Sequence, residues 1–195
     1  MSEKQIISLL RRHLPKQNVL SDAEELRPYE CDALSAYRQL PMVVVLPDTT
    51  EQVRTTRRLC SEHKVPVVAR GSGTGLSGGA LPLAEGVLLS LAKFNRIIDI
   101  DPHNRVARVQ PGVTNLAISK AVAAHGLYYA PDPSSQIACS IGGNVAENAG
   151  GVHCLKYGLT THNIQALEVL TIDGEQLSIG SQALDSPGYD LLALM

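Results

Sequence analysis

The chain has 195 residues, of which 44% are hydrophobic and 18% charged, and its formal net charge at pH 7 is -2. This length allows a buried core in one large domain or in two small lobes. Because acidic and basic residues nearly balance, we expect no nucleic-acid partner and no attraction to an anionic membrane surface. No segment approaches the ~20 apolar residues of a membrane span, so any contact with a membrane would come through a partner.

The four cysteines are scattered along the chain, at Cys31, Cys60, Cys139 and Cys154. None belongs to a C-x-x-C pair, and no cysteine–histidine set has the spacing of a zinc site, so we expect no metal. Unpaired thiols are typical of a reducing compartment, which favours a cytoplasmic protein.

An N-terminal helical segment is predicted over residues 1–40. The opening residues S-E-K-Q form a capping box, which predicts a helix over Ser2–His13. A second capping pattern, Ser21-x-x-Glu24, predicts another short helical turn.

A strand–helix–strand unit is predicted next, over Met42–Ala69. Leu40–Pro47 is a short apolar run bounded by prolines, which is typical of a buried strand. A capping box predicts a helix over Thr49–Lys64, and Val65–Ala69 is predicted to be a second strand, parallel to the first. The residues expected on the inward face of the helix are Val53, Thr56, Leu59 and Cys60.

Short strands and one further helix are predicted in the remainder of the chain. They are strands over Gly86–Leu91, Arg96–Asp101 and Arg105–Gln110, a helix over Thr114–Ala124 ended by Gly126, and a closing hairpin over Asn163–Asp173 and Gln176–Ile179. Asp101–Asn104 is the predicted turn between the second and third of these strands. Because strands and helices mix without strict alternation, the expected fold class is α+β, with lobes over about 41–104 and 105–195.

A dense run of glycines, Ala69–Gly79, directly follows a predicted strand. Closely spaced glycines let successive backbone N–H groups point into one concavity, which a diphosphate can fill. The polar side chains that could add to it are those of Arg70, Ser72, Thr74 and Ser77. The alternative is a tight turn without a ligand, but so many glycines in so short a run favour a phosphate-binding loop.

Part of this run also fits the dinucleotide-binding pattern G-x-G-x-x-G, at Gly73, Gly75 and Gly78. That pattern requires the third glycine to open a helix whose N-terminus binds the pyrophosphate. The residues that follow, A-L-P-L-A-E-G, place a proline and a glycine where the helix should run, so we reject the Rossmann interpretation. A Walker A loop is excluded as well, because no lysine follows Gly78.

Three motifs, in this order, resemble the FAD-linked oxidase family of the vanillyl-alcohol-oxidase type. They are RGSGTGLSGG (Arg70–Gly79), PDPSSQ (Pro131–Gln136) and CSIGGNVAENAGG (Cys139–Gly151). The adjoining GGVHCLKYGLT (Gly150–Thr160) is most similar to the glycolate oxidase FAD-binding subunit and to D-lactate and D-2-hydroxyglutarate dehydrogenases. The resemblance covers roughly residue 41 to the C-terminus. It implies a two-lobed PCMH-type FAD-binding domain over 41–195, with small mixed sheets flanked by helices.

The resemblance also implies which residues bind the cofactor. In this family the glycine loop holds the FAD diphosphate, the second motif approaches the isoalloxazine ring, and the third lies close to the planar ligand. Some members attach flavin covalently through a histidine in the loop; Thr74 stands there in this chain, which implies non-covalent FAD. The implied cofactor-binding residues are Arg70, Gly71, Ser72, Gly73, Thr74, Gly75, Leu76, Ser77, Gly78, Pro131, Asp132, Ser134, Ser135, Ser140, Ile141, Gly142, Gly143, Asn144, Ala146, Asn148, Gly150 and Gly151.

The second and third motifs each have a plainer alternative. The second could be a surface turn around Pro131 and Asp132. The glycines of the third could merely permit close packing of helix and strand. In either case Ser140 is expected to cap a short helix that begins at Ile141.

His153 and Tyr157 invite a catalytic assignment, because oxidation of a hydroxy acid needs a base for the hydroxyl proton. For His153 we favour a histidine held by a structural partner, and we expect no catalytic residue in this chain. In the resembled family the substrate-binding and base residues lie in a separate cap domain. Because the chain stops at Met195 within an apolar pattern, we expect it to be truncated before that domain.

The function implied by the resemblance is that of a FAD-dependent oxidoreductase acting on CH–OH groups. Its substrate would be a small 2-hydroxy acid such as glycolate or D-lactate, with hydride transfer to flavin N5. Other oxidase subunits would carry the electrons onward and would account for any association with a membrane. Two alternatives remain, a non-catalytic flavin-binding module and another oxidoreductase chemistry on the same scaffold.

Overall fold

The computed structural model describes residues 2–181 and 188–195, and it divides into two compact units. Unit 1 comprises Met1–Phe94 with Ile172–Glu175, and unit 2 comprises Asn95–Thr171 with Gln176–Met195. The chain passes from unit 1 to unit 2 ahead of the predicted position near residue 104, because residue 104 lies in the turn of a hairpin that belongs entirely to unit 2. Both units combine helices with short strands, which confirms the α+β class.

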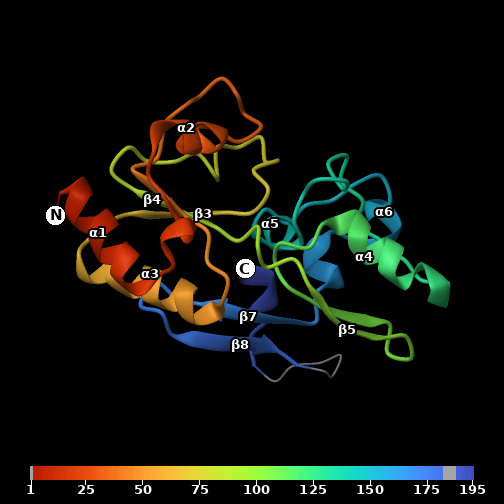
Figure 1. Ribbon diagram of the computed structural model, residues 1–195. Helices are drawn as coiled ribbons and strands as arrows, with labels where there is room; N and C mark the ends of the chain where they lie inside the picture. The colour runs from red at the N-terminus through yellow and green to blue at the C-terminus, as the bar shows by residue number, and fades with distance from the viewer. Residues whose placement is uncertain (1, 182–187) are drawn as a thin grey trace. The chain divides into compact units, whose positions relative to one another are not determined.

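Unit 1 is built on a four-stranded sheet with the strand order β1-β2-β4-β3 (Figure 1). Its elements are α1 (Glu3–His13), η1 (Lys16–Asn18), β1 (Val19–Leu20), α2 (Ala23–Leu26), η2 (Arg27–Tyr29), β2 (Val43–Val45), α3 (Thr50–Glu62), β3 (Val67–Arg70) and β4 (Val87–Ser90). The two strands of the predicted strand–helix–strand unit, β2 and β3, both run parallel to β4, which lies between them. Every residue of β4 is buried, as is typical of an interior strand of a parallel sheet.

The first forty residues, expected as a separate helical segment, belong to unit 1, because β1 pairs antiparallel with β2. The capping box of α1 is present, and the Ser2 N–H donates to Oε1 of Gln5 over 2.8 Å. The second predicted cap is wrong by one residue, since the N-cap of α2 is Asp22 and not Ser21. The Ser21 hydroxyl is used elsewhere, because it accepts a hydrogen bond from Nη2 of Arg11 at 3.0 Å.

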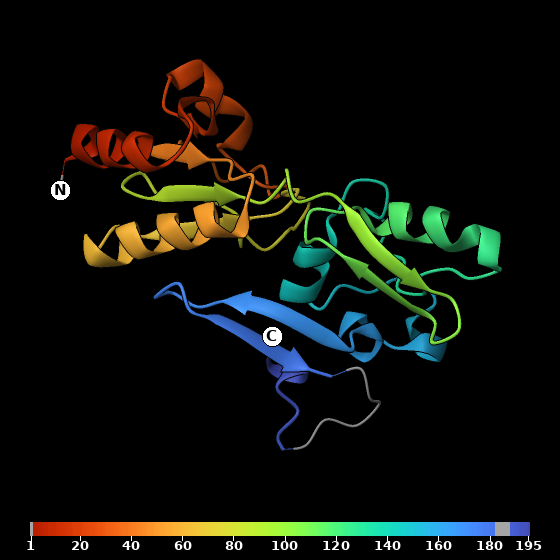
Figure 2. The ribbon, with the colours of Figure 1, turned by 60° about the horizontal axis from the view of Figure 1, so that its bottom comes forward.

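Helix α3 begins and packs as predicted. The Thr49 hydroxyl accepts a hydrogen bond from the N–H of Gln52, which satisfies one of the free donors at the helix start. The residues predicted for its inward face, Val53, Thr56, Leu59 and Cys60, are all buried. Figures 1 and 2 show α3 running alongside the sheet of unit 1. Leu26 of α2 packs with Val44 and Leu88 of the sheet in a separate apolar cluster.

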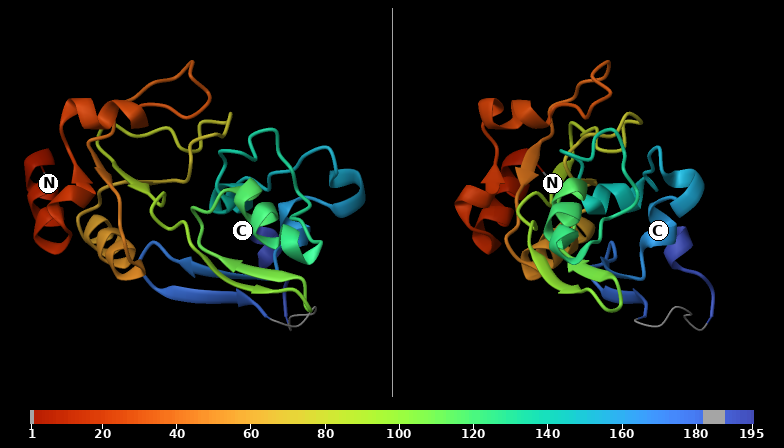
Figure 3. Two further views of the ribbon diagram at one scale, coloured as in Figure 1. Left: turned by 45° about the vertical axis from the view of Figure 1, so that its right-hand side comes forward. Right: turned by 90° about the vertical axis from the view of Figure 1, so that its right-hand side faces the viewer.

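Unit 2 contains two antiparallel hairpins and several short helices. Its elements are β5 (Ile97–Asp101), β6 (Val106–Val109), α4 (Asn115–Val122), η3 (Ala123–His125), α5 (Ile141–Ala146), α6 (Cys154–Tyr157), η4 (Thr160–Asn163), β7 (Ala166–Leu170), β8 (Gln176–Gly180) and η5 (Leu192–Leu194). A cluster of Val113, Ile118 and Ile141 joins α4 to α5, and apolar residues of β5 and β6 pack against it. Figure 3 shows α4 beside the β5–β6 hairpin.

The local signals predicted for unit 2 are present. Asp101 closes the β5–β6 turn by accepting hydrogen bonds from the backbone and side-chain N–H groups of Asn104. The Thr114 hydroxyl caps α4, and Gly126 follows η3 with a left-handed φ of 69°. Within residues 2–181 and 188–195, none of the helices has the length and apolar character needed to cross a bilayer.

Thiol reactivity tests this burial pattern. Cys60 is 1% exposed, and burial raises the pKa of its thiol to about 11. Because the thiolate is the reactive form, we expect iodoacetamide at mildly alkaline pH to spare Cys60 and buried Cys139 while modifying half-buried Cys31 and Cys154. Peptide mass spectrometry on native and urea-unfolded samples makes the comparison. Modification of native Cys60 as fast as Cys154 would contradict the packing of α3.

Candidate functional site

The glycine loop Gly71–Gly79 begins where β3 ends. Gly73 and Gly78 have φ values of 69° and 76°, a conformation that favours glycine. Within the described residues, no backbone N–H of the loop donates a hydrogen bond. Three loop hydroxyls likewise have no hydrogen-bond partner there, those of Ser72, Thr74 and Ser77. The loop therefore presents a run of available donors, which is the arrangement that holds a phosphate or another anion.

Arg70 braces this loop from inside unit 1. Its side chain is largely buried, and Nη1 donates to the carbonyl oxygen of Cys31 over 2.8 Å. The guanidinium also lies 5.7 Å from the centroid of the Tyr29 ring. A Cβ atom on Gly73 would overlap Nη2 of Arg70, so the loop closes directly over this side chain. Burial lowers the pKa of Arg70, although a guanidinium stays charged at neutral pH.

The segment around Cys31 is a part of the site that sequence analysis missed. Besides the bond from Arg70, the N–H of Ala33 donates to the carbonyl oxygen of Gly75 over 3.1 Å. No glycine, proline or capping pattern marks Cys31 and Ala33. Their role depends on contacts between residues distant in sequence, which local patterns do not encode.

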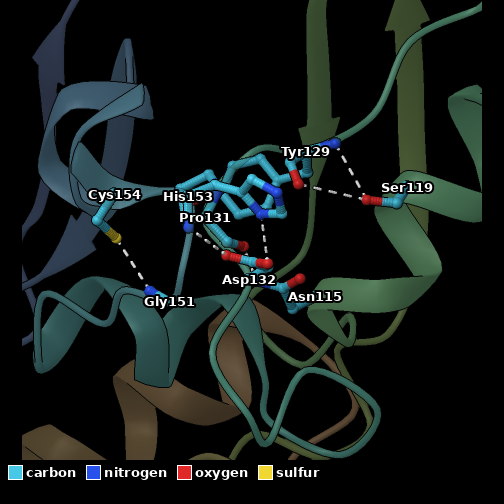
Figure 4. Close-up of polar contacts among 8 residues, drawn as sticks. All are labelled: Asn115, Ser119, Tyr129, Pro131, Asp132, Gly151, His153 and Cys154. Carbon is cyan, nitrogen blue, oxygen red and sulfur yellow. Dashed lines mark hydrogen bonds and ion pairs between the residues drawn. The ribbon is translucent and has the colours of Figure 1, made fainter. Parts of the chain in front are cut away.

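Two side chains of α4 hold the start of the second motif and the residues just before it. Nδ2 of the buried Asn115 donates to the carbonyl oxygen of Pro131 over 2.8 Å. The Ser119 hydroxyl accepts a hydrogen bond from the N–H of Tyr129 at 3.0 Å (Figure 4). Two hydroxyls of the motif make no hydrogen bond within the described residues, those of Ser134 and Ser135. The backbone of the motif is thus fixed, while its hydroxyls remain available to a ligand.

The third motif contains α5, which begins as predicted. Ser140 is the N-cap, and its hydroxyl accepts a hydrogen bond from the N–H of Gly143. Ile141 belongs to the apolar cluster of unit 2 and therefore contacts protein, whereas Ala146 at the other end of the helix is exposed.

Two asparagines of the third motif differ in whether their side-chain amides have hydrogen-bond partners. Asn148 adopts a left-handed φ of 46°, and its Oδ1 accepts a hydrogen bond from the N–H of Thr161. Asn144 is 2% exposed, yet its Nδ2 donates to no atom of the described residues. A buried amide without an acceptor is costly, so Asn144 is a strong candidate for hydrogen bonding to a ligand.

Three glycines of the third motif allow close packing within unit 2. The atoms that a Cβ would overlap belong to Pro111 at Gly142, to Leu159 and Cys154 at Gly150, and to Asp132 at Gly151. On that side these glycines meet protein, although none of the contacting residues belongs to a strand, as the packing of helix against strand would require. Gly143 is different, because a Cβ there would meet only the Ser140 hydroxyl, at 3.3 Å.

Asp132 and His153 join the second motif to the third. Nδ1 of His153 lies 2.6 Å from Oδ2 of Asp132, and the His153 N–H donates to Oδ1 over 3.3 Å (Figure 4). Burial opposes ionisation of Asp132, but the hydrogen bonds from His153 outweigh it and hold the pKa of this carboxyl below its ordinary value. The contact agrees with the favoured interpretation of His153 as a histidine held by a structural partner.

Tyr157, the other candidate for catalysis, contacts a second tyrosine. Its ring meets the ring of Tyr128 edge to face, with 6.1 Å between centroids, and Nζ of Lys156 lies 5.0 Å from its centroid. A hydrogen bond with Tyr128 and the nearby Lys156 lower the pKa of the Tyr157 phenol. The structure thus brings the second and third motifs together in unit 2, whereas the glycine loop lies in unit 1.

Comparison with known proteins identifies the fold. A family model described as FAD binding domain matches residues 41–180, which is most of the chain. The chain belongs to this FAD binding domain family. Its cofactor is FAD.

Named relatives and solved structures agree with the family. The chain is 67% identical to glycolate oxidase subunit GlcD of Escherichia coli over 189 residues, which cover 97% of this chain and 38% of that protein. It is 37% identical to a D-lactate dehydrogenase of Anaerostipes hadrus, covering 98% of this chain and 40% of that protein. A 4-ethylphenol oxidase from Gulosibacter chungangensis aligns with a TM-score of 0.83 and 25% identity, covering 98% of this chain and 39% of the oxidase. The chain thus spans about two fifths of the length of these proteins.

The residues present fit FAD. A diphosphate is a pure hydrogen-bond acceptor, and the glycine loop offers unpaired N–H groups together with three free hydroxyls. A flavin ring carries carbonyl oxygens and ring nitrogens, for which unit 2 offers the buried Nδ2 of Asn144 and the free hydroxyls of Ser134 and Ser135.

Two glycine substitutions separate backbone strain from steric overlap in the loop. Both Gly73→Ala and Gly78→Ala place alanine at a positive φ, which costs roughly 1–2 kcal/mol. Only at Gly73 does the added methyl group overlap Arg70, whereas nothing lies within 4 Å at Gly78. We therefore expect Gly73→Ala to lower the free energy of unfolding by about 1 kcal/mol more than Gly78→Ala, measured by urea denaturation. Equal losses would show that Arg70 does not brace the loop.

Acid titration tests the Asp132–His153 contact. A carboxyl whose pKa is lowered by folding stabilises the folded state at pH values above its pKa in the unfolded chain. The reference value of that unfolded pKa is 3.8. This contribution is lost as the pH falls through the folded pKa. We expect the difference in unfolding free energy between wild type and Asp132→Asn to shrink as the pH falls below about 4. Urea denaturation at several pH values measures this difference in unfolding free energy. The contributions of the other carboxyls cancel, because both proteins contain them. A difference that does not vary with pH would contradict the contact.

Proposed function

We propose that this chain is the FAD-binding part of a flavin-dependent dehydrogenase or oxidase that oxidises a small 2-hydroxy acid, such as glycolate or D-lactate. The observation that carries the proposal is the 67% identity with glycolate oxidase subunit GlcD across 97% of the chain. The similarity to a D-lactate dehydrogenase supports the same class of substrate.

The chain's own contribution would be to bind and orient the cofactor. Bound FAD would supply the oxidising capacity, as the acceptor of a hydride at flavin N5. We assign the diphosphate to the backbone N–H groups of Gly71–Gly78, with the hydroxyls of Ser72, Thr74 and Ser77. We assign the flavin ring to donors of the second and third motifs, chiefly Ser134, Ser135 and Asn144. We assign no catalytic residue, since both candidates in this chain are engaged by neighbouring side chains.

We further propose that the cofactor is bound without a covalent link and that the protein works with partners. Thr74, which cannot form the histidine linkage of some related flavoproteins, supports non-covalent FAD. The name of GlcD describes it as a subunit, which supports transfer of electrons to other oxidase subunits. Those subunits would also account for any membrane association of a cytoplasmic protein.

A different oxidoreductase chemistry is the second candidate. The similarity to a 4-ethylphenol oxidase extends over 98% of this chain, and that protein is named for a phenol and not for a hydroxy acid. Because specificity depends on the residues of the site and not on the fold, the scaffold is compatible with both. A flavin-binding module without catalysis is the remaining alternative.

Anaerobic flavin reduction separates these candidates. We expect the purified full-length protein to be yellow, and addition of glycolate or D-lactate to bleach its visible absorbance as hydride reaches the flavin. Bleaching by 4-ethylphenol alone would favour the second candidate. A protein that retains FAD but is bleached by none of these compounds would favour the non-catalytic module. A colourless protein that FAD cannot reconstitute would contradict the assignment of the cofactor site.

A further inference from the structure

Two segments of unit 2 that include residues of the second and third motifs lie against each other. One is the second motif, Pro131–Gln136, and the other is residues 150–154, which connect the third motif to α6. Figure 4 shows the polar contacts between them, which converge on Asp132. Both carboxylate oxygens of Asp132 are used, one by the ring and one by the backbone N–H of His153.

The backbones of the two segments also approach closely. A Cβ atom on Gly151 would overlap the backbone carbonyl of Asp132, so only glycine leaves room at that position. This close contact is independent of the His153 side chain. Side-chain and backbone observations therefore place the same two segments against each other.

The two segments differ in how they are anchored to the rest of unit 2. The start of the second motif is fixed on α4, since buried Asn115 donates to the carbonyl of Pro131 and Ser119 accepts from Tyr129, two residues before the motif. Residues 150–154 have little apolar anchoring, because Val152 is 86% exposed. Since apolar burial is the main force that holds short segments in place, this one depends on its polar contacts instead.

We propose that Asp132 and His153 form a latch that holds residues 150–154 against the second motif, in the arrangement that receives FAD. Both are positioning residues, since they act through the segments that they join. This inference rests on the proposed function, in which the second and third motifs contact the cofactor, because residues 150–154 contain the last two residues of the third motif. It gives Asp132 a role through its carboxylate that is separate from any contact with the flavin.

Two amide substitutions at one position test the latch in the full-length protein. Asn places its Nδ2 donor where Nδ1 of His153 lies, whereas Gln places its amide near Nε2 and leaves Oδ2 of Asp132 without a donor. Both residues are uncharged, so the comparison isolates the position of the donor. We expect His153→Gln and Asp132→Ala to weaken FAD binding roughly tenfold or more, and His153→Asn to stay close to wild type.

FAD affinity is measured on the apoprotein by quenching of FAD fluorescence, and the geometry of the site by the visible circular dichroism of bound FAD. We expect His153→Gln and Asp132→Ala to change that dichroism in the same way, and His153→Asn to preserve it. Gly151→Ala separates the two segments while leaving both latch side chains intact, and should reproduce the weakened binding. His103→Gln, in the exposed β5–β6 turn, is the matched control and should bind FAD as wild type does.

The outcomes are distinct. Equal FAD affinity and dichroism for wild type, His153→Gln and Asp132→Ala would overturn the latch, while FAD binding by wild type would leave the proposed function intact. Equal weakening by His153→Asn and His153→Gln would also overturn it, because the donor at Nδ1 would then not matter. Failure of the wild-type protein to bind FAD would contradict the proposed function itself.

Discussion

Asn115, at the start of α4, hydrogen-bonds two different loops from one fully buried position. Its side chain donates to the carbonyl of Pro131, and its backbone N–H donates to the carbonyl of Cys139. These acceptors belong to the second and third motifs, so one residue sets the distance of each motif from the same helix. The spacing of the free hydroxyls and of the Asn144 amide therefore depends on these two bonds from the start of α4.

Much of the fold could be predicted because its signals are local. A cap depends on residues three apart, and so the starts of α3 and α5 at Thr49 and Ser140 follow from the sequence. The one cap placed wrongly, at Ser21, failed because Arg11 takes the serine hydroxyl. That competing contact comes from another element, and no local pattern reports it.

Other features depend on pairing in space. The insertion of β4 between β2 and β3 could not be predicted, because both parallel pairings satisfy the same apolar pattern. The glycines of the third motif marked a place of close approach, but whether a ligand or protein occupied it was not encoded locally. The structure places Asp132 against Gly151 and Pro111 against Gly142, so packing accounts for part of that signal. The glycine loop was easier to predict, because its composition alone indicates backbone N–H groups without hydrogen-bond partners.

The discontinuity of unit 1 affects how the chain can fold during synthesis. Residues Ile172–Glu175 belong to this unit, and within it Nε of Arg54 donates to the carbonyl of Gly174 over 3.1 Å. A ribosome synthesises the chain from its N-terminus at a limited rate. The first 94 residues of unit 1 therefore leave the ribosome before residues 172–175 have been synthesised. The last contacts of unit 1 form only when most of unit 2 has emerged. Completion of the two units is therefore linked in time by the order of translation.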